Sequence, residues 1–302
     1  KPFLDKGKPP VRVGRKAMGL QLGVSQLPKG RIFMYRRAVA LFLSFLLMGL
    51  FSSPALAANT IDTSQVAQGL VVVEYNDPTP QGHLRVTVEN LNKLGENQYA
   101  YYLKPGVRNN FPLQLGRGQY RVTVLEHVKD NLYRPLKRES FAVELAEDDE
   151  GLYLQSVQNV PWKGAPSVVA KARELAQKGD GDKEKFLLIH HYLVQGMAYD
   201  YKKVDLLPSD YLPDVEETLR SGKGICYDFA SLLAAMLRSQ GIPTKLVMGN
   251  GEGINGYHAW NEVFLEGSWR VVDLTSDIQY HAAGQAFSIF KNPDAYGKTR
   301  EY

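Results

Sequence analysis

Three residues of the C-terminal half, Cys226, His258 and Asp273, have side chains suited to thiol chemistry. Cys226 is the single cysteine among the 302 residues, so it has no partner for a disulfide within the chain. A thiol nucleophile needs a base that takes its proton, and an imidazole serves well when a carboxylate fixes its tautomer and stabilises the imidazolium. These residues therefore predict a nucleophile, a general base and an orienting carboxylate.

Cys226 stands directly before a predicted helix. Residues 227–240 place apolar side chains at i, i+3, i+4, i+7 and i+8, which is the spacing of one helix face. Unpaired backbone N–H groups at the start of a helix favour a thiolate and can donate hydrogen bonds to an oxyanion. Gly224, two residues earlier, would let the backbone approach a substrate closely. The helix is therefore expected to present Cys226 at its N-terminus.

His258 and Asp273 are predicted on two strands of one hairpin. Residues 257–265 alternate in polarity, and residues 269–274 form the second strand. A two-residue turn at positions 266 and 267 would pair His258 with Thr275. Asp273 would then be a diagonal neighbour of His258, about 7–8 Å away at the backbone. The hairpin is thus expected to supply the base and its carboxylate.

These segments resemble the transglutaminase-like superfamily of papain-fold cysteine enzymes. The matching blocks are Gly-x-Cys-x-Asp-Phe-Ala at 224–230, Gly-Ile-Pro at 241–243, His-Ala-Trp-Asn-Glu-Val at 258–263 and Trp-x-Val-Val-Asp at 269–273. The resemblance covers roughly residues 160–280. It implies that Cys226 is the nucleophile, His258 the general base and Asp273 its orienter. It also implies an α+β, papain-like core in which the cysteine helix packs on an antiparallel sheet.

Three further residues are candidates for oxyanion or substrate contacts: Tyr199, Gly224 and Trp260. Tyr199 belongs to a Tyr-Asp pair that resembles the one often found before the cysteine block of the family. A packed aromatic is the alternative for Tyr199, and a core position is the alternative for Trp260.

We expect no metal and no cofactor. His190 and His191 are adjacent on a predicted helix over residues 182–197, so their side chains point about 100° apart and do not readily share a metal ion. Ordinary helix histidines are the prediction for both. The sequence contains neither the His-Glu-x-x-His pattern nor an EF-hand loop.

The chain divides into a β-rich domain at 60–155, of unknown role, and a transglutaminase-like domain at 160–302. Short alternating segments at 69–75, 83–89, 99–103, 119–126 and 140–145 are separated by turn signals, which predicts a small antiparallel β-sandwich. Helical spacing begins at 166–178 and continues at 182–197. The α+β core is therefore expected to follow a β-sandwich.

Residues 34–57 have the pattern of a secretory signal peptide, with an apolar run after Arg37 and cleavage expected after Ala57. An uncleaved membrane anchor is the alternative. Residues 1–33 are interpreted as a disordered or mis-assigned extension. Ten basic residues and one acidic residue give residues 1–37 a charge of +9, so the rest of the chain carries −5 of the total +4. This acidic body argues against nucleic-acid binding.

The predicted function is that of a secreted or cell-envelope thiol enzyme. It would act on peptide, isopeptide or glutamine amide bonds through an acyl-enzyme, with hydrolysis slightly favoured over amine transfer. A protein or peptide substrate at the cell surface is expected, with no stable membrane span after signal cleavage. The alternatives are a non-catalytic binding module of the same fold and a cysteine that forms a disulfide with another chain. The sequence leaves the oligomeric state open.

Overall fold

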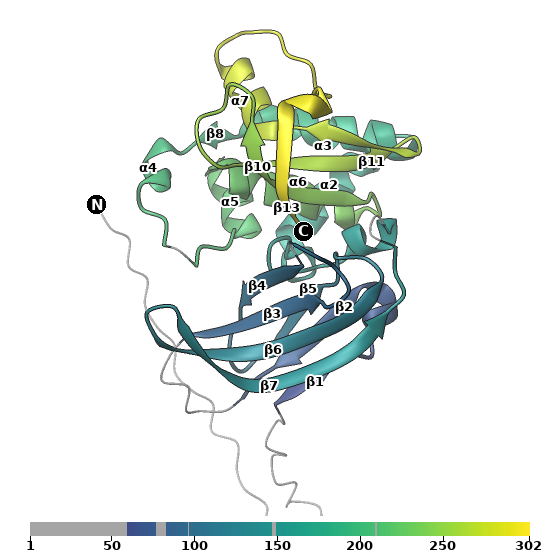
Figure 1. Cartoon of the computed structure of the whole chain (residues 1–302). Coiled ribbons are helices and arrows are strands. Elements are labelled where there is room, and N and C mark those ends of the chain that lie inside the picture. Colours follow the sequence, from purple (N-terminus) through teal and green to yellow (C-terminus); the bar gives the residue numbers. More distant parts are fainter. Residues whose placement is uncertain (1–58, 77–82, 96, 147–148, 209) are drawn as a thin grey trace, which may run out of the picture. The chain divides into compact units, whose positions relative to one another are not determined.

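The computed structural model describes residues 59–76, 83–95, 97–146, 149–208 and 210–302 (Figure 1). The predictions for residues 1–33 and for the signal peptide at 34–57 lie outside the described residues. Within the described ranges, no helix is both long enough and apolar enough to cross a membrane. The domain boundaries near residue 160 stay a prediction.

The N-terminal part of the described chain consists of two antiparallel sheets. One has the order β1-β2-β5 and the other the order β4-β3-β6-β7. Their strands are β1 (Thr60–Asp62), β2 (Leu70–Glu74), β3 (Leu84–Asn90), β4 (Gln98–Tyr102), β5 (Arg108–Pro112), β6 (Gly118–Lys129) and β7 (Leu132–Val143). Alternate side chains of β3 are buried, as a half-buried strand requires. Apolar side chains from both sheets share one core, which confirms the predicted sandwich.

The strand expected at 140–145 is the end of a much longer strand. β7 begins at Leu132 and pairs with β6 in a hairpin whose two strands have twelve residues each. Its polar and charged outward side chains hide the strand pattern from the sequence, because only Val143 in this strand is buried. Strand β5 was not predicted either. It lacks the alternation of apolar residues that identified its neighbours.

The C-terminal part combines helices with a second antiparallel sheet of order β12-β11-β10-β13. Its helices are α2 (Pro166–Ala176), α3 (Gly181–Gly196), α4 (Tyr201–Val204), α5 (Val215–Ser221), α6 (Cys226–Ser239) and α7 (Leu274–Ala282). Its strands are β10 (Thr244–Gly251), β11 (His258–Leu265), β12 (Ser268–Val272) and β13 (Tyr296–Glu301), with a short parallel pair β8 (Ala198–Tyr199) and β9 (Lys223–Gly224). Short 3-10 turns occupy Val66–Gln68, Glu150–Leu154, Trp162–Gly164 and Pro293–Ala295.

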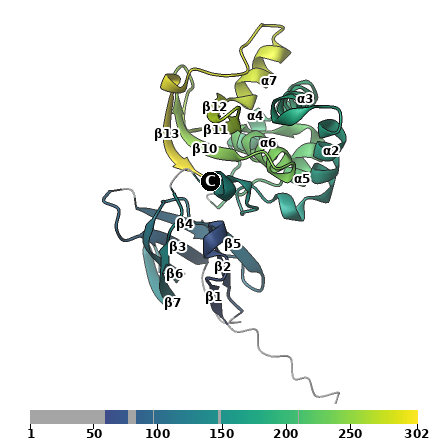
Figure 2. The ribbon, with the colours of Figure 1, turned by 90° about the vertical axis from the view of Figure 1, so that its right-hand side faces the viewer.

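Helix α6 is the centre of this part. Every residue from Asp228 to Arg238 is buried, because α6 packs on β10 and β11 on one side and on α2, α3 and α5 on the other. Figure 2 shows the sheet and these helices in separate layers with α6 between them. The predicted α+β core, with the cysteine helix on an antiparallel sheet, is therefore confirmed.

The hairpin of β11 and β12 has the predicted register. Leu265 pairs with Ser268 across the turn formed by Glu266 and Gly267, both at positive φ. The second strand, however, ends at Val272, so the prediction of a strand through residue 274 was wrong. Asp273 instead caps α7, because its side chain accepts a hydrogen bond from the backbone N–H of Ser276.

Candidate active site

Cys226 is the first residue of α6, preceded by the cap residue Ile225 in an extended conformation. The backbone N–H of Ile225 donates to Asp228 Oδ2 at 2.9 Å, and this bond fixes how the chain enters the helix. The thiol is partly exposed. It lines a cleft of about 900 Å³ together with His258 and Tyr199. The predicted position of Cys226 at a helix N-terminus is thus what the structure shows.

His258 is the first residue of β11, and Asp273 is the cap of α7. Their Nε2 and Oδ2 atoms lie 2.9 Å apart, with His258 6% and Asp273 0% exposed. Because Nε2 is engaged by Asp273, the other ring nitrogen, Nδ1, remains for Cys226, to which His258 also forms a side-chain hydrogen bond. The structure therefore brings the three predicted residues together in the order Cys226, His258, Asp273. Their catalytic roles stay a prediction.

The pKa values of the histidine and the carboxyl reflect this arrangement. Burial by itself would lower the pKa of His258, but the hydrogen bonds to Asp273 and Cys226 outweigh it and raise this pKa to about 9. Burial would likewise raise the pKa of Asp273, but the bonds from His258 and Ser276 hold it below its ordinary value. The site thus favours an imidazolium next to a carboxylate.

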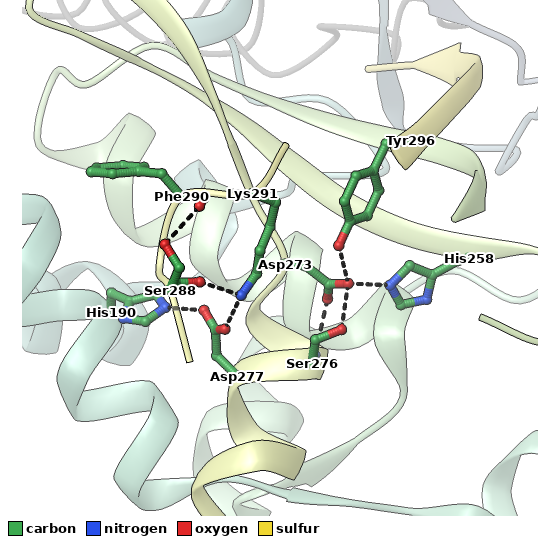
Figure 3. Close-up of polar contacts among 9 residues, drawn as sticks. All are labelled: His190, His258, Asp273, Ser276, Asp277, Ser288, Phe290, Lys291 and Tyr296. Atoms are coloured by element: carbon green, nitrogen blue, oxygen red, sulfur yellow. Dashed lines mark hydrogen bonds and ion pairs between the residues drawn. The ribbon is translucent and has the colours of Figure 1, made fainter. Parts of the chain in front are cut away.

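Two residues that the sequence analysis missed complete the surroundings of Asp273. Ser276 Oγ donates to Oδ2 at 2.6 Å, and the Tyr296 hydroxyl donates to the same oxygen at 2.9 Å (Figure 3). Ser276 could have been found as the third residue after a helix cap. Tyr296 comes from β13, 23 residues further along the chain, and no local pattern signals it.

The structure places Tyr199, the candidate for an oxyanion contact, near the thiol, and its role stays a prediction. Tyr199 lines the same cleft as Cys226, on β8, whose backbone pairs with β9 directly before the cysteine. Burial is the main cause that raises the pKa of Tyr199 to about 12, and the nearby Cys226 is the second cause. The hydroxyl of Tyr199 therefore keeps its proton near neutral pH. A protonated phenol in this place can donate a hydrogen bond to an oxyanion.

Gly224 and Trp260, in contrast, are not among the described residues that line the cleft. A Cβ on Gly224 would lie 2.8 Å from the Cβ of Asp228, so the glycine is needed for packing against α6. Trp260 is 1% exposed, and its ring stacks on that of His258 with centroids 6.3 Å apart. A role of either residue in substrate contact stays a prediction, and the structure gives each a packing role.

A second buried histidine pairs with a different aspartate of α7. His190 on α3 is 2% exposed, and its Nε2 is 2.8 Å from Asp277 Oδ2. Lys291 pairs with the other oxygen of this carboxylate, and its ammonium also contacts the carbonyl of Ser288 (Figure 3). The prediction of an ordinary helix histidine therefore missed a buried charged network, because its partners lie about 90 residues away.

Besides Cys226, His258 and Tyr199, the lining of the cleft includes residues of α4, of the loop from Glu252 to Asn255, and of the first turns of α7. The glycine-rich loop after β10 is therefore part of the cleft wall. Among the described residues, no group of three or more His, Cys, Asp or Glu side chains is placed to hold a metal ion.

Comparison with known proteins supports the resemblance. Residues 169–274 match the model of the transglutaminase-like superfamily, and this segment contains Cys226, His258 and Asp273. A segment covering 34% of the chain is 29% identical, over 113 residues, to the kyphoscoliosis peptidase of Mus musculus. The match spans 17% of that mouse protein.

Two solved structures are also similar. A candidate cysteine protease from Cytophaga hutchinsonii matches with 17% identity and a TM-score of 0.38, over 77% of this chain and 86% of that one. The periplasmic domain of TgpA from Pseudomonas aeruginosa matches with 17% identity and a TM-score of 0.36, over 75% and 96%. The family match supports a thiol enzyme in general. Residues 169–274 of the chain thus match the transglutaminase-like superfamily.

Proposed function

We propose that this chain is a thiol enzyme that attacks amide bonds of proteins or peptides through an acyl-enzyme on Cys226. The observation that supports it best is the position of His258, which is hydrogen-bonded to buried Asp273 on one side and to Cys226 on the other, at the wall of a cleft. A cysteine, a base and an orienting carboxylate in hydrogen-bond contact are the arrangement that nucleophilic catalysis needs.

The first half of the reaction forms a thioester. His258 takes the thiol proton of Cys226, and the sulfur bonds to the carbonyl carbon of the substrate amide. The carbonyl oxygen becomes an oxyanion, which backbone N–H groups at the start of α6 and the Tyr199 hydroxyl can stabilise. When the oxyanion collapses, the C–N bond breaks and the leaving amine takes the proton from the His258 imidazolium.

The second half releases the acyl group. His258 takes a proton from the acceptor as the acceptor oxygen or nitrogen attacks the thioester carbon. The C–S bond then breaks, and the thiolate of Cys226 recovers its proton from the imidazolium. Water as acceptor gives hydrolysis, and a primary amine gives transfer. Throughout, Asp273 keeps the imidazole in one tautomer and compensates its charge.

Hydrolysis is proposed over amine transfer. The support is the name of the mouse relative, a peptidase that is 29% identical over the matched segment. Peptide, isopeptide and glutamine side-chain amides all fit the same chemistry, since each presents a carbonyl carbon and an amine leaving group.

Action outside the cytoplasm is part of the proposal. The apolar run and the small residues before Ala57 support export. A protein or peptide substrate at the cell surface follows from export and from the chemistry of the site.

The test of the site is the rate of iodoacetamide alkylation of Cys226 between pH 5 and 10. Because the chain has one cysteine, labelling reports this thiol alone. In the wild type we expect fast alkylation well below pH 8.5, the approximate pKa of a free thiol. In His258→Ala this fast reaction should disappear, whereas His191→Ala, a change of an exposed histidine on α3, should leave it intact.

Identical profiles for the wild type and His258→Ala would overturn the proposal, and the binding-module alternative would replace it. The acceptor is tested separately, with glutamine-containing peptides incubated with and without a fluorescent primary amine. Free acid or cleaved peptide in both reactions supports hydrolysis. Incorporation of the amine as the main product would show that transfer is the activity.

A further inference from the structure

Strand β13 brings to Asp273 a residue that lies beyond the family match, which ends at residue 274. Tyr296 is the first residue of this strand, and its hydroxyl lies 2.9 Å from Asp273 Oδ2. Figure 3 shows the ring directed at the carboxylate from the side opposite Ser276. Tyr296 therefore joins the site from an element that the matched segment does not contain.

Gly249 lets β13 come close enough for this contact. The pairing of β13 with β10 shifts its register between Met248 and Gly249. At that point a Cβ on Gly249 would lie 2.0 Å from the carbonyl oxygen of Gly297, far inside the normal contact distance. Only a residue without a side chain fits there, so the position of Tyr296 depends on Gly249.

The ring of Tyr296 is held by its neighbours. Its centroid lies 5.1 Å from that of Trp260, and Trp260 in turn stacks on His258. Tyr296 is partly buried and lines the same cleft as Cys226. This packing leaves the hydroxyl little freedom to turn away from Asp273.

Oδ2 of Asp273 accepts three hydrogen bonds, from His258, Ser276 and Tyr296. Ser276 is local to the helix cap, three residues along the chain. Tyr296 is the donor that ties the carboxylate to the sheet on which His258 stands. A phenol that donates to a carboxylate also takes up part of its negative charge, so it moderates how strongly Asp273 attracts the imidazolium.

We propose that Tyr296 is a positioning residue, whose hydroxyl holds the Asp273 carboxylate in line with His258 and moderates its interaction with the imidazolium. This inference rests on the proposed thiol function. Tyr296 acts through Asp273 and touches neither the thiol nor the attacked carbonyl in the proposed reaction.

The experiment is the alkylation profile of Cys226 in Tyr296→Phe, measured with iodoacetamide on the full chain from pH 5 to 10. Phenylalanine keeps the ring contact with Trp260 and removes one donor to Asp273. We expect alkylation at pH 7 to fall roughly 2- to 10-fold, the effect of one hydrogen bond. The alkaline transition of the profile, at which His258 loses its proton, should move to higher pH. The reason is that more of the negative charge of Asp273 then faces His258.

Two matched controls separate this effect from a loss of stability. Tyr120→Phe removes a buried tyrosine hydroxyl of the β-sandwich, which donates to the carbonyls of Leu113 and Gly116, and should leave the profile unchanged. Gly249→Ala should reproduce the Tyr296→Phe profile by displacing β13. Gly196→Ala, at a glycine whose added Cβ would meet nothing within 4 Å, should not. Thermal unfolding of each variant shows whether it is folded at the assay temperature.

The outcomes are distinct. An unchanged profile in Tyr296→Phe, with His258→Ala still different from the wild type, would overturn the role of Tyr296 and leave the thiol function standing. A lower rate without any shift of the alkaline transition would also overturn it, since a purely structural role predicts that result. If the wild type and His258→Ala are alike, the proposed function itself fails.

Discussion

Asp273 and Asp277 lie four residues apart at the start of α7, and each carboxylate binds a different buried histidine. Asp273 contacts His258 at 2.9 Å, and Asp277 contacts His190 at 2.8 Å. Both carboxylates are fully buried. The first turn of α7 is therefore held toward β11 by one aspartate and toward α3 by the other, and this double attachment sets the position of the residue that orients His258.

Asp277→Asn should destabilise the fold strongly. The change removes the charge that pairs with Lys291, whose side chain is 13% exposed, and breaking a buried ion pair costs about 3–5 kcal/mol. The free energy of unfolding in urea measures the loss. Asp182→Asn is the control, because its pair with Lys185 is exposed and should contribute less than about 1 kcal/mol. Equal effects of the two changes would show that Asp277 does not anchor α7.

Stability should fall as the pH rises through the titration of His258. Its pKa is about 9 in the folded chain against an ordinary value of 6.5, so the imidazolium stabilises the fold fully below pH 6.5. That contribution is lost between pH 6.5 and about 9. The free energy of unfolding of the wild type should therefore decrease over this interval by more than that of His258→Ala. Parallel curves for the two proteins would contradict the raised pKa.

The low pKa of Asp273 acts in the opposite direction. A carboxyl whose pKa is depressed by folding stabilises the native state above its ordinary value of 3.8 and loses that contribution as the pH falls through the lower, folded value. Asp273→Asn should thus weaken the dependence of stability on pH in acid, as measured by thermal unfolding between pH 2 and 5. An unchanged acid dependence would argue that Asp273 is not held as a carboxylate.

Arg238→Met should cost several kcal/mol of stability. Arg238 is 3% exposed, and its guanidinium donates to three backbone carbonyls, those of Thr244 at 2.8 Å, Gln155 at 2.7 Å and Tyr302 at 2.6 Å. Each buried carbonyl left without a donor costs about 1–3 kcal/mol. Chemical denaturation measures the difference.

The control for this change is Arg220→Met. Arg220 pairs with Glu217 on the surface of α5, with 74% of its side chain exposed, so its removal should alter stability by less than about 1 kcal/mol. If Arg238→Met were no more destabilising than this control, the three carbonyls would have to find other donors.

Asp228→Asn should loosen α4, the short helix that Lys203 ties to the first turn of the cysteine helix α6. Asp228 is fully buried and accepts hydrogen bonds from the N–H of Ile225, from Lys203 at 2.6 Å and from the hydroxyl of Tyr211. The amide keeps one acceptor, so the expected loss is about 1–3 kcal/mol. Hydrogen exchange should become faster at the amides of α4. Unchanged exchange there would show that the segment is held by other contacts.

Much of the candidate site could be predicted from local sequence. The apolar stripe after Cys226 defines a helix, and the turn at Glu266 and Gly267 sets the register of the hairpin, which the structure confirms. Both features depend on residues within about fifteen positions of one another. Asp273 was assigned to the strand because it continues the alternation of β12, but its side chain competes for the backbone N–H of Ser276 and starts a helix instead.

The sequence by itself determined which residues could do chemistry: one thiol before an amphipathic helix, one imidazole at the head of a strand and one carboxylate that it assigned to the next strand. Only the tertiary structure decided what surrounds them. Tyr296 reaches Asp273 because Gly249, which has no side chain, lets β13 approach β10, and His190 reaches Asp277 because α3 packs beside α7. Such contacts join residues 23 and 87 positions apart, and no short-range periodicity encodes them, since they depend on how whole elements pack.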